Sequence, residues 1–346
     1  MKPMSQSTMH EAEYYEIIDE SNKVAQCQLC PIRCTLLVGE RGKCFSRVNI
    51  EGKLYSLTYG YTDMKIDMIE KQHVYHFFPN SRVQTFSTFN CNLDCDYCSM
   101  PEKLGVDPSE VGAKKLAPDQ AAMFSMASGS KVIAFGEAEP LISFEWVRDT
   151  AKLAQQRNLK VLLRTNAYFC EEPVSEILEF VDAVTIDIKS LSDSGYQEKC
   201  HAGTINDIKK TIKLIHEKGK LIELNLAIHE ALGNTEEETR ELATWIKEEL
   251  SPSVPLHLAR LIPSHRLKEL QPTSTELLEK CYEVAKDVGL EFIYLDNVPD
   301  HEATNTYCPN CKELLIHRGA SDTEVRRVSL QGNCNKCETN LNIVFK

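Results

Sequence analysis

Hydrophobic and polar positions alternate with two different periods along the middle of the chain. Short apolar runs rich in valine, isoleucine and leucine predict strands at residues 82–89, 131–137, 159–166, 182–189, 220–229 and 255–263. Between them, apolar residues recur at the spacing of a helix turn, most clearly at residues 143–157, 235–250 and 273–289. Strands that alternate with helices predict an α/β fold with a parallel sheet, because two parallel strands need a long crossover connection.

Local signals support the limits of these helices. Thr235 has the side-chain oxygen of a helix cap, and the glutamates after it are favoured by the positive end of the helix dipole. The last helical segment ends at Gly289, a residue that readily takes the left-handed conformation beyond a helix. Six β-then-α units with right-handed crossovers follow from this order. They fit a curved partial barrel or an open doubly wound sheet, and periodicity does not choose between the two.

Composition excludes several classes of function. With 42% hydrophobic and 26% charged residues, the 346-residue chain has the composition of an ordinary globular protein. It has no run of about 18 apolar residues, so no membrane span is expected. The first residues, MKPMSQSTMHEAEYYEII, lack the apolar core of a signal peptide, which predicts a cytoplasmic protein. A net charge of −12 argues against nucleic acid as a partner, because phosphate binding needs clustered lysine and arginine.

The 14 cysteines are the strongest chemical signal in the sequence. In a reducing compartment, clustered cysteines indicate metal ligands rather than disulfides. Eleven of them form three groups: Cys27, Cys30, Cys34 and Cys44; Cys91, Cys95 and Cys98; and Cys308, Cys311, Cys334 and Cys337. We therefore expect an N-terminal cysteine-rich module at 1–75, a central core at 76–300 and a C-terminal cysteine-rich module at 301–346.

The C-terminal group has the ligand spacing of a zinc ribbon. CPNC at 308–311 and CNKC at 334–337 are two Cys-x2-Cys pairs, and the runs ELLIHR and EVRRVSL between them predict short strands. A closed site with four cysteines would stabilise a segment too small to build its own core. Zinc is the predicted metal, and iron of the rubredoxin type is the alternative.

The N-terminal group, Cys27-x2-Cys30-x3-Cys34-x9-Cys44, has a less diagnostic spacing. Four thiolates close to Pro31 and to glycines at positions 39 and 42 suit either zinc or an auxiliary iron–sulfur cluster. Metal binding with a structural or electron-relay role is the expectation, and the metal stays open.

The central group lies in the stretch FNCNLDCDYCSMP, directly after the first predicted strand. Three thiolates at C-x3-C-x2-C leave one coordination position unfilled, whereas a structural zinc site usually has four protein ligands. A 4Fe–4S cluster held by three cysteines has one iron free to bind something else. Ligands bind at the carboxyl edge of parallel sheets, where this loop is expected to lie. A three-cysteine zinc site and buried cysteines without metal are the alternatives.

This spacing, C-x3-C-x-aromatic-C with Tyr97 as the aromatic residue, resembles the signature of radical S-adenosylmethionine (SAM) enzymes. In that superfamily the open iron binds the amine and carboxylate of SAM. Reductive cleavage then releases a 5′-deoxyadenosyl radical that takes a hydrogen atom from the substrate. The resemblance implies a partial (β/α)6 TIM-type barrel, sensitivity to oxygen, and a low-potential electron donor such as flavodoxin or ferredoxin.

A longer resemblance covers nearly the whole chain from about residue 25. CQLCPIRCTLLVGERGKC and NVPDHEATNTYCPNC resemble the AmmeMemoRadiSam system radical SAM enzymes, which are related to the pyruvate formate-lyase activating enzyme group. Those activases make a glycyl radical on a partner protein, which implies a protein or peptide substrate. A small metabolite or cofactor precursor is the alternative substrate. A non-catalytic iron–sulfur electron carrier or scaffold is the alternative from another class.

The same resemblance assigns residues to SAM. FGEAEP stands where related activases have Gly-Gly-Glu-Pro, which places Glu139 at the methionyl amine and replaces the glycine pair with Glu137–Ala138. RTNA resembles Asp-Thr-Asn-Gly, so Asn166 matches while Arg164 replaces the aspartate. Tyr97 is expected against the adenine.

Three further strand-end positions complete the set. IDIK resembles Asp-Leu-Lys, which places Asp187 and Lys189 beside the cofactor, with the lysine near the SAM carboxylate. LIPSH gives His265 as a ribose or methionyl contact. Cys200, after the fourth predicted strand, is a candidate catalytic thiol that would donate a hydrogen atom to a substrate radical. For each polar residue, a solvated partner at the sheet edge is the alternative.

Overall fold

A single large sheet organises the computed structural model, which describes residues 9–320 and 322–346. Its spatial order is β14-β13-β12-β11-β10-β9-β8-β7. The strands are β7 (Asp63–Met68), β8 (Arg82–Ser87), β9 (Val132–Gly136), β10 (Lys160–Thr165), β11 (Ala183–Ile188), β12 (Leu221–Ile228), β13 (Leu256–Arg260) and β14 (Ile293–Asp296). All six predicted strands are present, and each begins within one residue of its predicted start.

The order of the strands decides between the two predicted architectures. From β8 to β14 each strand is parallel to the next, and the order in space is the order in sequence. A doubly wound sheet would reverse direction at a switch point, whereas successive crossovers in one direction build a barrel wall. The partial barrel with six βα units is therefore confirmed, with β14 added after the sixth helix-bearing crossover.

The sequence pattern missed the two outer strands. β7 pairs antiparallel with β8 at the edge of the sheet, and its sequence DMKIDM alternates polar and apolar residues over only six positions, with Met64 and Ile66 exposed. β14 is only four residues long, IYLD, and begins shortly after the helix that ends at Val288. Both strands carry a strand-like pattern that is too short to stand out in the sequence.

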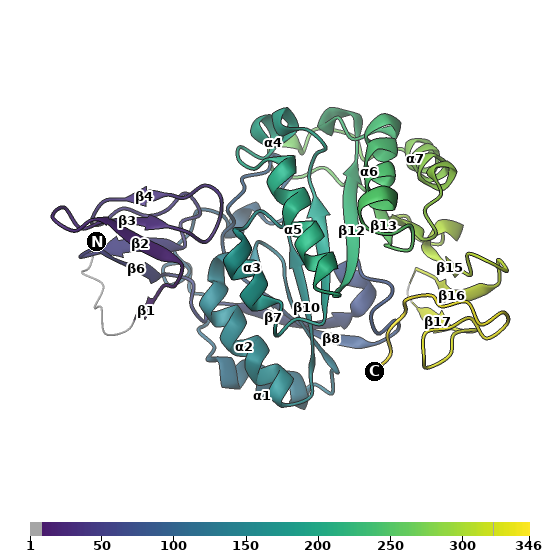
Figure 1. Ribbon diagram of the computed structural model, residues 1–346, viewed down its shortest axis with the longest axis horizontal. Helices are drawn as coiled ribbons and strands as arrows, with labels where there is room; N and C mark the ends of the chain where they lie inside the picture. The colour runs from purple at the N-terminus through teal and green to yellow at the C-terminus, as the bar shows by residue number, and fades with distance from the viewer. Residues whose placement is uncertain (1–8, 321) are drawn as a thin grey trace.

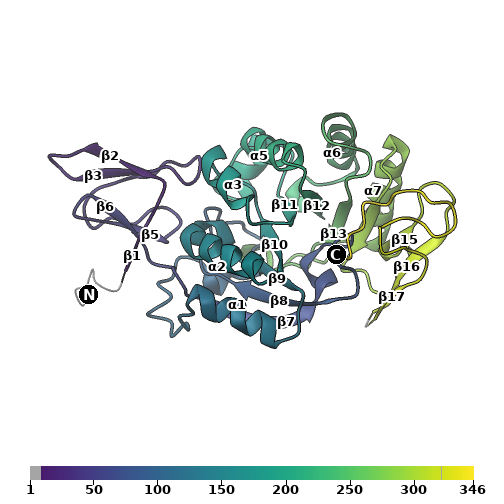
Figure 2. The same ribbon diagram turned by 60° about the horizontal axis from the view of Figure 1, so that its bottom comes forward.

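The helices lie along the outer side of the sheet (Figures 1 and 2). They are α1 (Pro118–Ala127), α2 (Phe144–Gln156), α3 (Glu171–Ile177), α4 (Asp193–Lys199), α5 (Ile205–Glu217), α6 (Glu236–Glu249) and α7 (Thr275–Val288). In α2 the predicted apolar face is buried, and Trp146 packs edge-on against Phe86 and Phe135 of the sheet. Thr235 caps α6 in a capping box with Glu238, as its sequence predicts.

The N-terminal module lies at one end of the molecule (Figure 1) and consists of two small antiparallel sheets. One contains β1 (His10–Glu11), β5 (Arg47–Ile50) and β6 (Lys53–Ser56), and the other β2 (Tyr15–Asp19), β3 (Val24–Cys27) and β4 (Thr35–Leu36). A buried ion pair joins the module to α2, with Arg47 Nη2 2.6 Å from Glu145 Oε1. Removing one partner of such a pair costs about 3–5 kcal/mol, so the module is firmly attached.

The C-terminal module lies at the opposite end (Figure 1). Its sheet consists of β15 (Thr306–Tyr307), β16 (Leu314–Arg318) and β17 (Thr323–Val325). A buried cluster combines Leu315 and Ile316 of this module with Tyr75, Phe292 and Tyr294 of the core. In the described part of the chain, no helix is long and apolar enough to cross a membrane.

Candidate active site

A cavity of about 500 Å³ opens at the carboxyl ends of the parallel strands. All seven of these strands contribute to its wall at or just beyond their ends, because parallel strands point their carboxyl ends to the same edge. The polar wall residues include Cys91, Cys95 and Cys98 after β8, Glu139 after β9, Asn166 after β10, Lys189 after β11, Asn225 on β12, Arg260 on β13 and Asn297 after β14. The structure thus brings the three central cysteines together with four of the predicted SAM-binding residues, Glu139, Asn166, Asp187 and Lys189, and with Tyr97.

Hydrogen bonds to sulfur prepare the cysteine loop for a metal. The Leu93 amide donates to Cys91 Sγ at 3.3 Å, and the Met100 amide donates to Cys98 Sγ at 3.4 Å. Asn166 Nδ2 lies 3.5 Å from Cys91 Sγ as a side-chain donor. Burial, with Glu139 next, raises the pKa of the Cys91 thiol well above its usual range. A bound cation would therefore release the thiol proton, and the amides would then support the thiolate.

The segment LIPSH and the next residue, Arg266, hold the cysteine loop in place. Ser264 Oγ lies 2.9 Å from the carbonyl oxygens of both Tyr97 and Cys98. Arg266 pairs with Asp94 at 2.7 Å and with Asp96 at 3.1 Å. These contacts fix the loop that carries the cysteines.

His265 makes none of these contacts with the cysteine loop. Among the described residues it is not on the cavity wall, and its backbone φ is 50°. A ribose or methionyl contact by His265 stays a prediction, and it would require the side chain to turn into the cavity.

Glu139 links the ends of β9 and β10. It is 1% exposed, and its carboxylate accepts hydrogen bonds from the Leu141 amide (3.1 Å), Thr165 Oγ1 (2.9 Å) and the Asn166 amide (2.8 Å). Burial raises its pKa to about 7, although these donors act in the opposite direction. A buried carboxylate with several donors holds the two strand ends in fixed positions.

The residues before Glu139 keep a glycine-like backbone without glycine. Glu137 and Ala138 have φ values of 59° and 53°, in the left-handed region that glycine adopts without steric cost. Glu137 is also paired with Lys65 of β7. The Glu-Ala pair therefore preserves a turn that a Gly-Gly pair would form more easily.

A compact charged group lies on the β10–β12 side of the cavity. Arg164 Nε and Nη2 lie 3.1 and 3.0 Å from Asp187 Oδ2, and Asn225 Nδ2 lies 2.8 Å from Asp187 Oδ1. Lys189 Nζ stands farther away, 3.5 Å from Asp187 Oδ2. Burial opposes ionisation of Asp187, but Arg164 and Lys189 hold its pKa well below the usual range. Two cations against one carboxylate leave this wall suited to an anionic group.

A buried chain of acids and histidines was not anticipated. His73 Nδ1 lies 2.5 Å from Asp296 Oδ2, and the same oxygen lies 3.1 Å from His257 Nδ1. His257 Nε2 lies 2.7 Å from Glu223 Oε2. His73 reaches the cavity wall. Because β14 was not predicted, its terminal Asp296 could not be placed at the sheet edge.

Cys200 lies close to the cysteine loop but is not one of the residues that line the cavity. It is 0% exposed, and Cys95 and Tyr97 are close enough to its thiol to influence the pKa of Cys200. Its carbonyl oxygen accepts the Asp94 amide at 2.9 Å. The predicted catalytic role of this thiol stays a prediction, and its direct contact is with a residue of the metal-binding motif.

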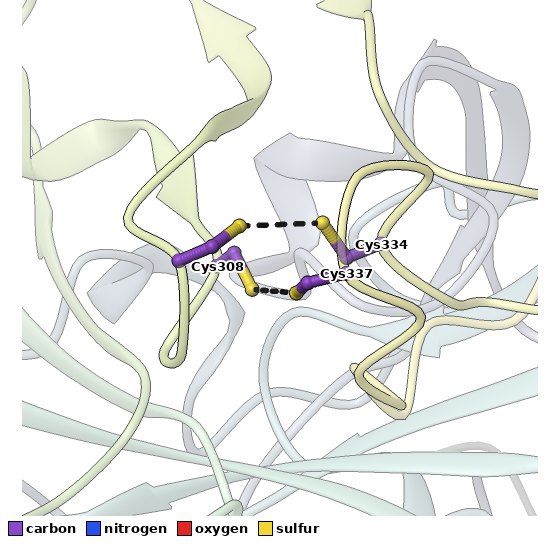
Figure 3. Close-up of side chains that lie close together, drawn as sticks. Cys308, Cys334 and Cys337 are labelled. Atoms are coloured by element: carbon purple, nitrogen blue, oxygen red, sulfur yellow. Dashed lines mark hydrogen bonds between the residues drawn. The ribbon is translucent and has the colours of Figure 1, made fainter.

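The four C-terminal cysteines converge on one point (Figure 3). Their sulfurs all lie within 4.8 Å of one another, with Cys308–Cys337 at 3.5 Å and Cys311–Cys334 at 3.7 Å. Tetrahedral zinc with bonds of about 2.3 Å separates its sulfurs by about 3.8 Å. The arrangement fits one tetrahedral ion of zinc or iron. The N-terminal cysteines instead line a small cavity of their own.

Comparison with known proteins supplies the family. The model of the radical SAM superfamily matches residues 85–246. An uncharacterized protein of Methanocaldococcus jannaschii is 32% identical over 339 residues, covering 97% of this chain and 100% of that protein. The pyruvate formate-lyase-activating enzyme of Clostridium pasteurianum is 26% identical over 189 residues, covering 51% of this chain and 73% of the enzyme.

Solved structures that are similar to this chain include a domain of a pyruvate-formate lyase-activating enzyme from Bacteroides vulgatus. It is 22% identical, covers 47% of this chain and 98% of that chain, and has a TM-score of 0.41. A radical SAM methyltransferase from Sphaerobacter thermophilus is 13% identical, covers 63% of this chain and 67% of that chain, and has a TM-score of 0.49.

The residues of the cavity fit the cofactors that this superfamily uses. Three thiols share one wall, amide donors already point at two of them, and the cavity beside them is within the volume range of small-molecule sites. The chain belongs to the radical SAM superfamily, in which a cysteine-bound 4Fe–4S cluster and SAM act together.

Proposed function

We propose that the protein cleaves SAM reductively at a 4Fe–4S cluster held by Cys91, Cys95 and Cys98, and abstracts a hydrogen atom from a protein or peptide substrate. One observation supports this most strongly: the three cysteines share a single open cavity with polar residues from the carboxyl ends of the parallel strands. When bound, the cluster supplies the electron that cleaves SAM. The chain itself supplies ligands, orientation and exclusion of water.

Glu139 and Lys189 are proposed to grip the methionyl end of SAM. Glu139 Oε2 accepts one hydrogen bond, from the Asn166 amide, and a carboxylate oxygen has a second acceptor site for an ammonium group. The Lys189 ammonium has one long contact, to Asp187, so it keeps donors for the methionyl carboxylate. Arg164 occupies Asp187 more closely and so leaves Lys189 available.

Tyr97 and Asn166 are proposed to position the cofactors. The Tyr97 hydroxyl donates to the Lys189 carbonyl oxygen at 3.3 Å, which holds the ring at the cavity wall where an adenine could lie against it. Asn166 Nδ2 donates to Asn92 Oδ1 at 2.8 Å as well as to Cys91 Sγ, so it orients the first cysteine of the motif. Substitution of either residue would weaken SAM binding or cluster loading before it affected the fold.

The substrate class rests on the partial likeness to the activating enzyme of Clostridium pasteurianum. A protein or peptide substrate would enter the cavity at the sheet edge, and a flavodoxin or ferredoxin would deliver the electron. A small anionic metabolite is the second candidate, favoured by Arg164, Arg260 and Lys189, which all line the cavity. Zinc at the C-terminal four-cysteine site would serve a structural role.

The test is the formation of 5′-deoxyadenosine from SAM by the anaerobically reconstituted, dithionite-reduced protein. Cys95→Ala is expected to abolish it, because the cluster loses a ligand. Cys281→Ala, a buried cysteine of α7 outside the cavity, is the matched control and is expected to retain it. Equal product from both variants, or none from the wild type with its cluster loaded, would overturn the proposal.

A further inference from the structure

The two outer cysteine groups have the same number of thiols but different geometry. Across residues 9–320 and 322–346, the C-terminal four are the only group of three or more cysteine, histidine or acidic side chains whose donor atoms all lie within 4.8 Å of one another. The N-terminal four do not meet that limit, although they face one another. A single tetrahedral ion needs sulfurs about 3.8 Å apart, whereas each thiolate of a cubane cluster binds its own iron and stands farther from the others.

The N-terminal sulfurs surround a space instead of a point. The wall of this cavity contains all four cysteines together with Leu29, Ile32, Gly42, Arg47 and Ile142. The volume of this cavity is about 20 Å³. The wall of this small space offers mainly thiols and apolar groups, and so few hydrogen-bond partners for a water. An apolar shell with thiol ligands is the setting of iron–sulfur clusters.

Donors are aimed at these sulfurs as well. The Lys43 amide donates to Cys34 Sγ at 3.4 Å, and Arg47 Nη1 lies 3.7 Å from Cys27 Sγ. Hydrogen bonds to cysteine sulfur tune the reduction potential of a cluster. Arg47 is itself fixed by Glu145 of the barrel, so this donor has a defined position.

Gly42 lines the same space. A Cβ added at this position would lie 3.8 Å from Cys34 Sγ and 3.9 Å from Cys44 Sγ, at ordinary contact distance. Its backbone is not in the left-handed region, so the conformation alone does not require glycine. A Cβ alone would therefore fit beside the two thiols, and a larger side chain would be needed to reduce the space that Gly42 lines.

We propose that Cys27, Cys30, Cys34 and Cys44 bind a second 4Fe–4S cluster with four protein ligands. Because all four irons would then have cysteine ligands, this cluster would have no open iron for SAM. The site is an electron-transfer site and not a second catalytic one.

A short segment connects this site to the central one. The Tyr168 carbonyl oxygen accepts Asn92 Nδ2 at 2.7 Å, and the Cys170 amide donates to the Leu29 carbonyl oxygen at 3.1 Å. Asn92 is next to Cys91, and Leu29 is next to Cys30. The following role rests on the proposed function. The second cluster takes one electron from a flavodoxin- or ferredoxin-type donor and passes it to the central cluster. The donor is oxidised by one electron, and no proton or bond changes in this step.

The site is tested in the full-length Cys91→Ala/Cys95→Ala/Cys98→Ala variant, reconstituted anaerobically with iron and sulfide. We expect about four irons and four sulfides at the N-terminal site, with a reduced paramagnetic signal that SAM does not change. Zinc in that site, or no inorganic sulfide, would overturn the proposal. This variant lacks the central site, so the result does not depend on whether the proposed function holds.

A single-site variant guards against loss of the fold. Gly42→Val is expected to lower iron and sulfide in the triple-alanine background, while metal at the C-terminal site stays unchanged as an internal measure of folding. Undiminished loading in Gly42→Val would count against a cluster in this cavity.

The relay is tested with the central site intact. Replacement of the four N-terminal cysteines by serine is expected to stop 5′-deoxyadenosine formation with a flavodoxin donor and to leave it with dithionite. Equal turnover with both reductants would overturn the relay.

Discussion

The Arg164 guanidinium grips Asp187 with Nε and Nη2 3.1 and 3.0 Å from the same carboxylate oxygen. This pair stands where related activases carry an aspartate in place of the arginine. Arg164 therefore forms the close ion pair with the Asp187 carboxylate. Lys189 Nζ lies 3.5 Å from the same carboxylate and is only loosely held by it. The arrangement leaves donors of the Lys189 ammonium available on the cavity wall.

The first prediction concerns this pair. In Arg164→Met, Lys189 would move onto Asp187 and lose its availability for the methionyl carboxylate. We expect the Kd for SAM to rise about tenfold, equivalent to about 1.4 kcal/mol, measured by calorimetry on the cluster-loaded protein. Arg240→Met on the exposed side of α6 is the matched control. An unchanged Kd in Arg164→Met would contradict the role given to Lys189.

The second prediction concerns backbone strain beside Glu139. Ala138 has φ 53°, so Ala138→Gly should stabilise the protein by about 1 kcal/mol. Ala134→Gly, in the buried part of β9, should instead destabilise it. Urea unfolding of the two variants without cofactors gives the comparison. If Ala138→Gly destabilises the protein, the packing energy of the alanine methyl group is larger than the strain energy of the turn.

The third prediction concerns the buried acid–histidine chain. Burial lowers the pKa of His257, but Asp296 and Glu223 outweigh it and raise the pKa to about 9. The folded state therefore holds its proton more tightly than the unfolded state, whose histidine pKa is about 6.5. The resulting stabilisation is complete below about pH 6.5 and is lost as the pH rises to about 9, a change of about 3 kcal/mol.

His257→Gln removes this titration. Its unfolding free energy should vary less between pH 6.5 and 9 than that of the wild type. A purely structural loss would lower stability equally at every pH and leave the wild-type slope in place, and that result would contradict a charged His257.

The fourth prediction separates two roles for Cys200. Its thiol contacts Cys95 inside the protein, which favours an effect on the cluster over an encounter with substrate. We expect Cys200→Ala to shift the reduction potential of the central cluster while 5′-deoxyadenosine still forms. An unchanged potential, with 5′-deoxyadenosine formed but the substrate radical left unquenched, would instead support the hydrogen-donor role.

Strong local patterns made much of the fold predictable. Parallel strands such as β11 and β12 are buried on both faces, so apolar-rich runs marked them within a residue. β14 has only the short apolar run FIYL, soon after a helix, and Asp296 and Asn297 were missed with it at the sheet edge. The LIPSH motif was read as offering His265 to SAM, whereas Ser264 of this motif bonds the cysteine loop and His265 is not among the cavity-lining residues.

Cysteine spacing indicated candidate metal sites without defining their geometry. Cys-x2-Cys pairs serve both single ions and clusters, so the difference between the converging C-terminal sulfurs and the open N-terminal cavity required the three-dimensional arrangement.

The most direct test of the central claim is electron paramagnetic resonance of the reduced central cluster with and without SAM. It is best recorded in the protein whose four N-terminal cysteines are serine, so that only Cys91, Cys95 and Cys98 can hold a cluster. We predict a signal that changes when SAM binds and that disappears in Cys95→Ala. A cluster signal indifferent to SAM would contradict the account and leave an iron–sulfur electron carrier.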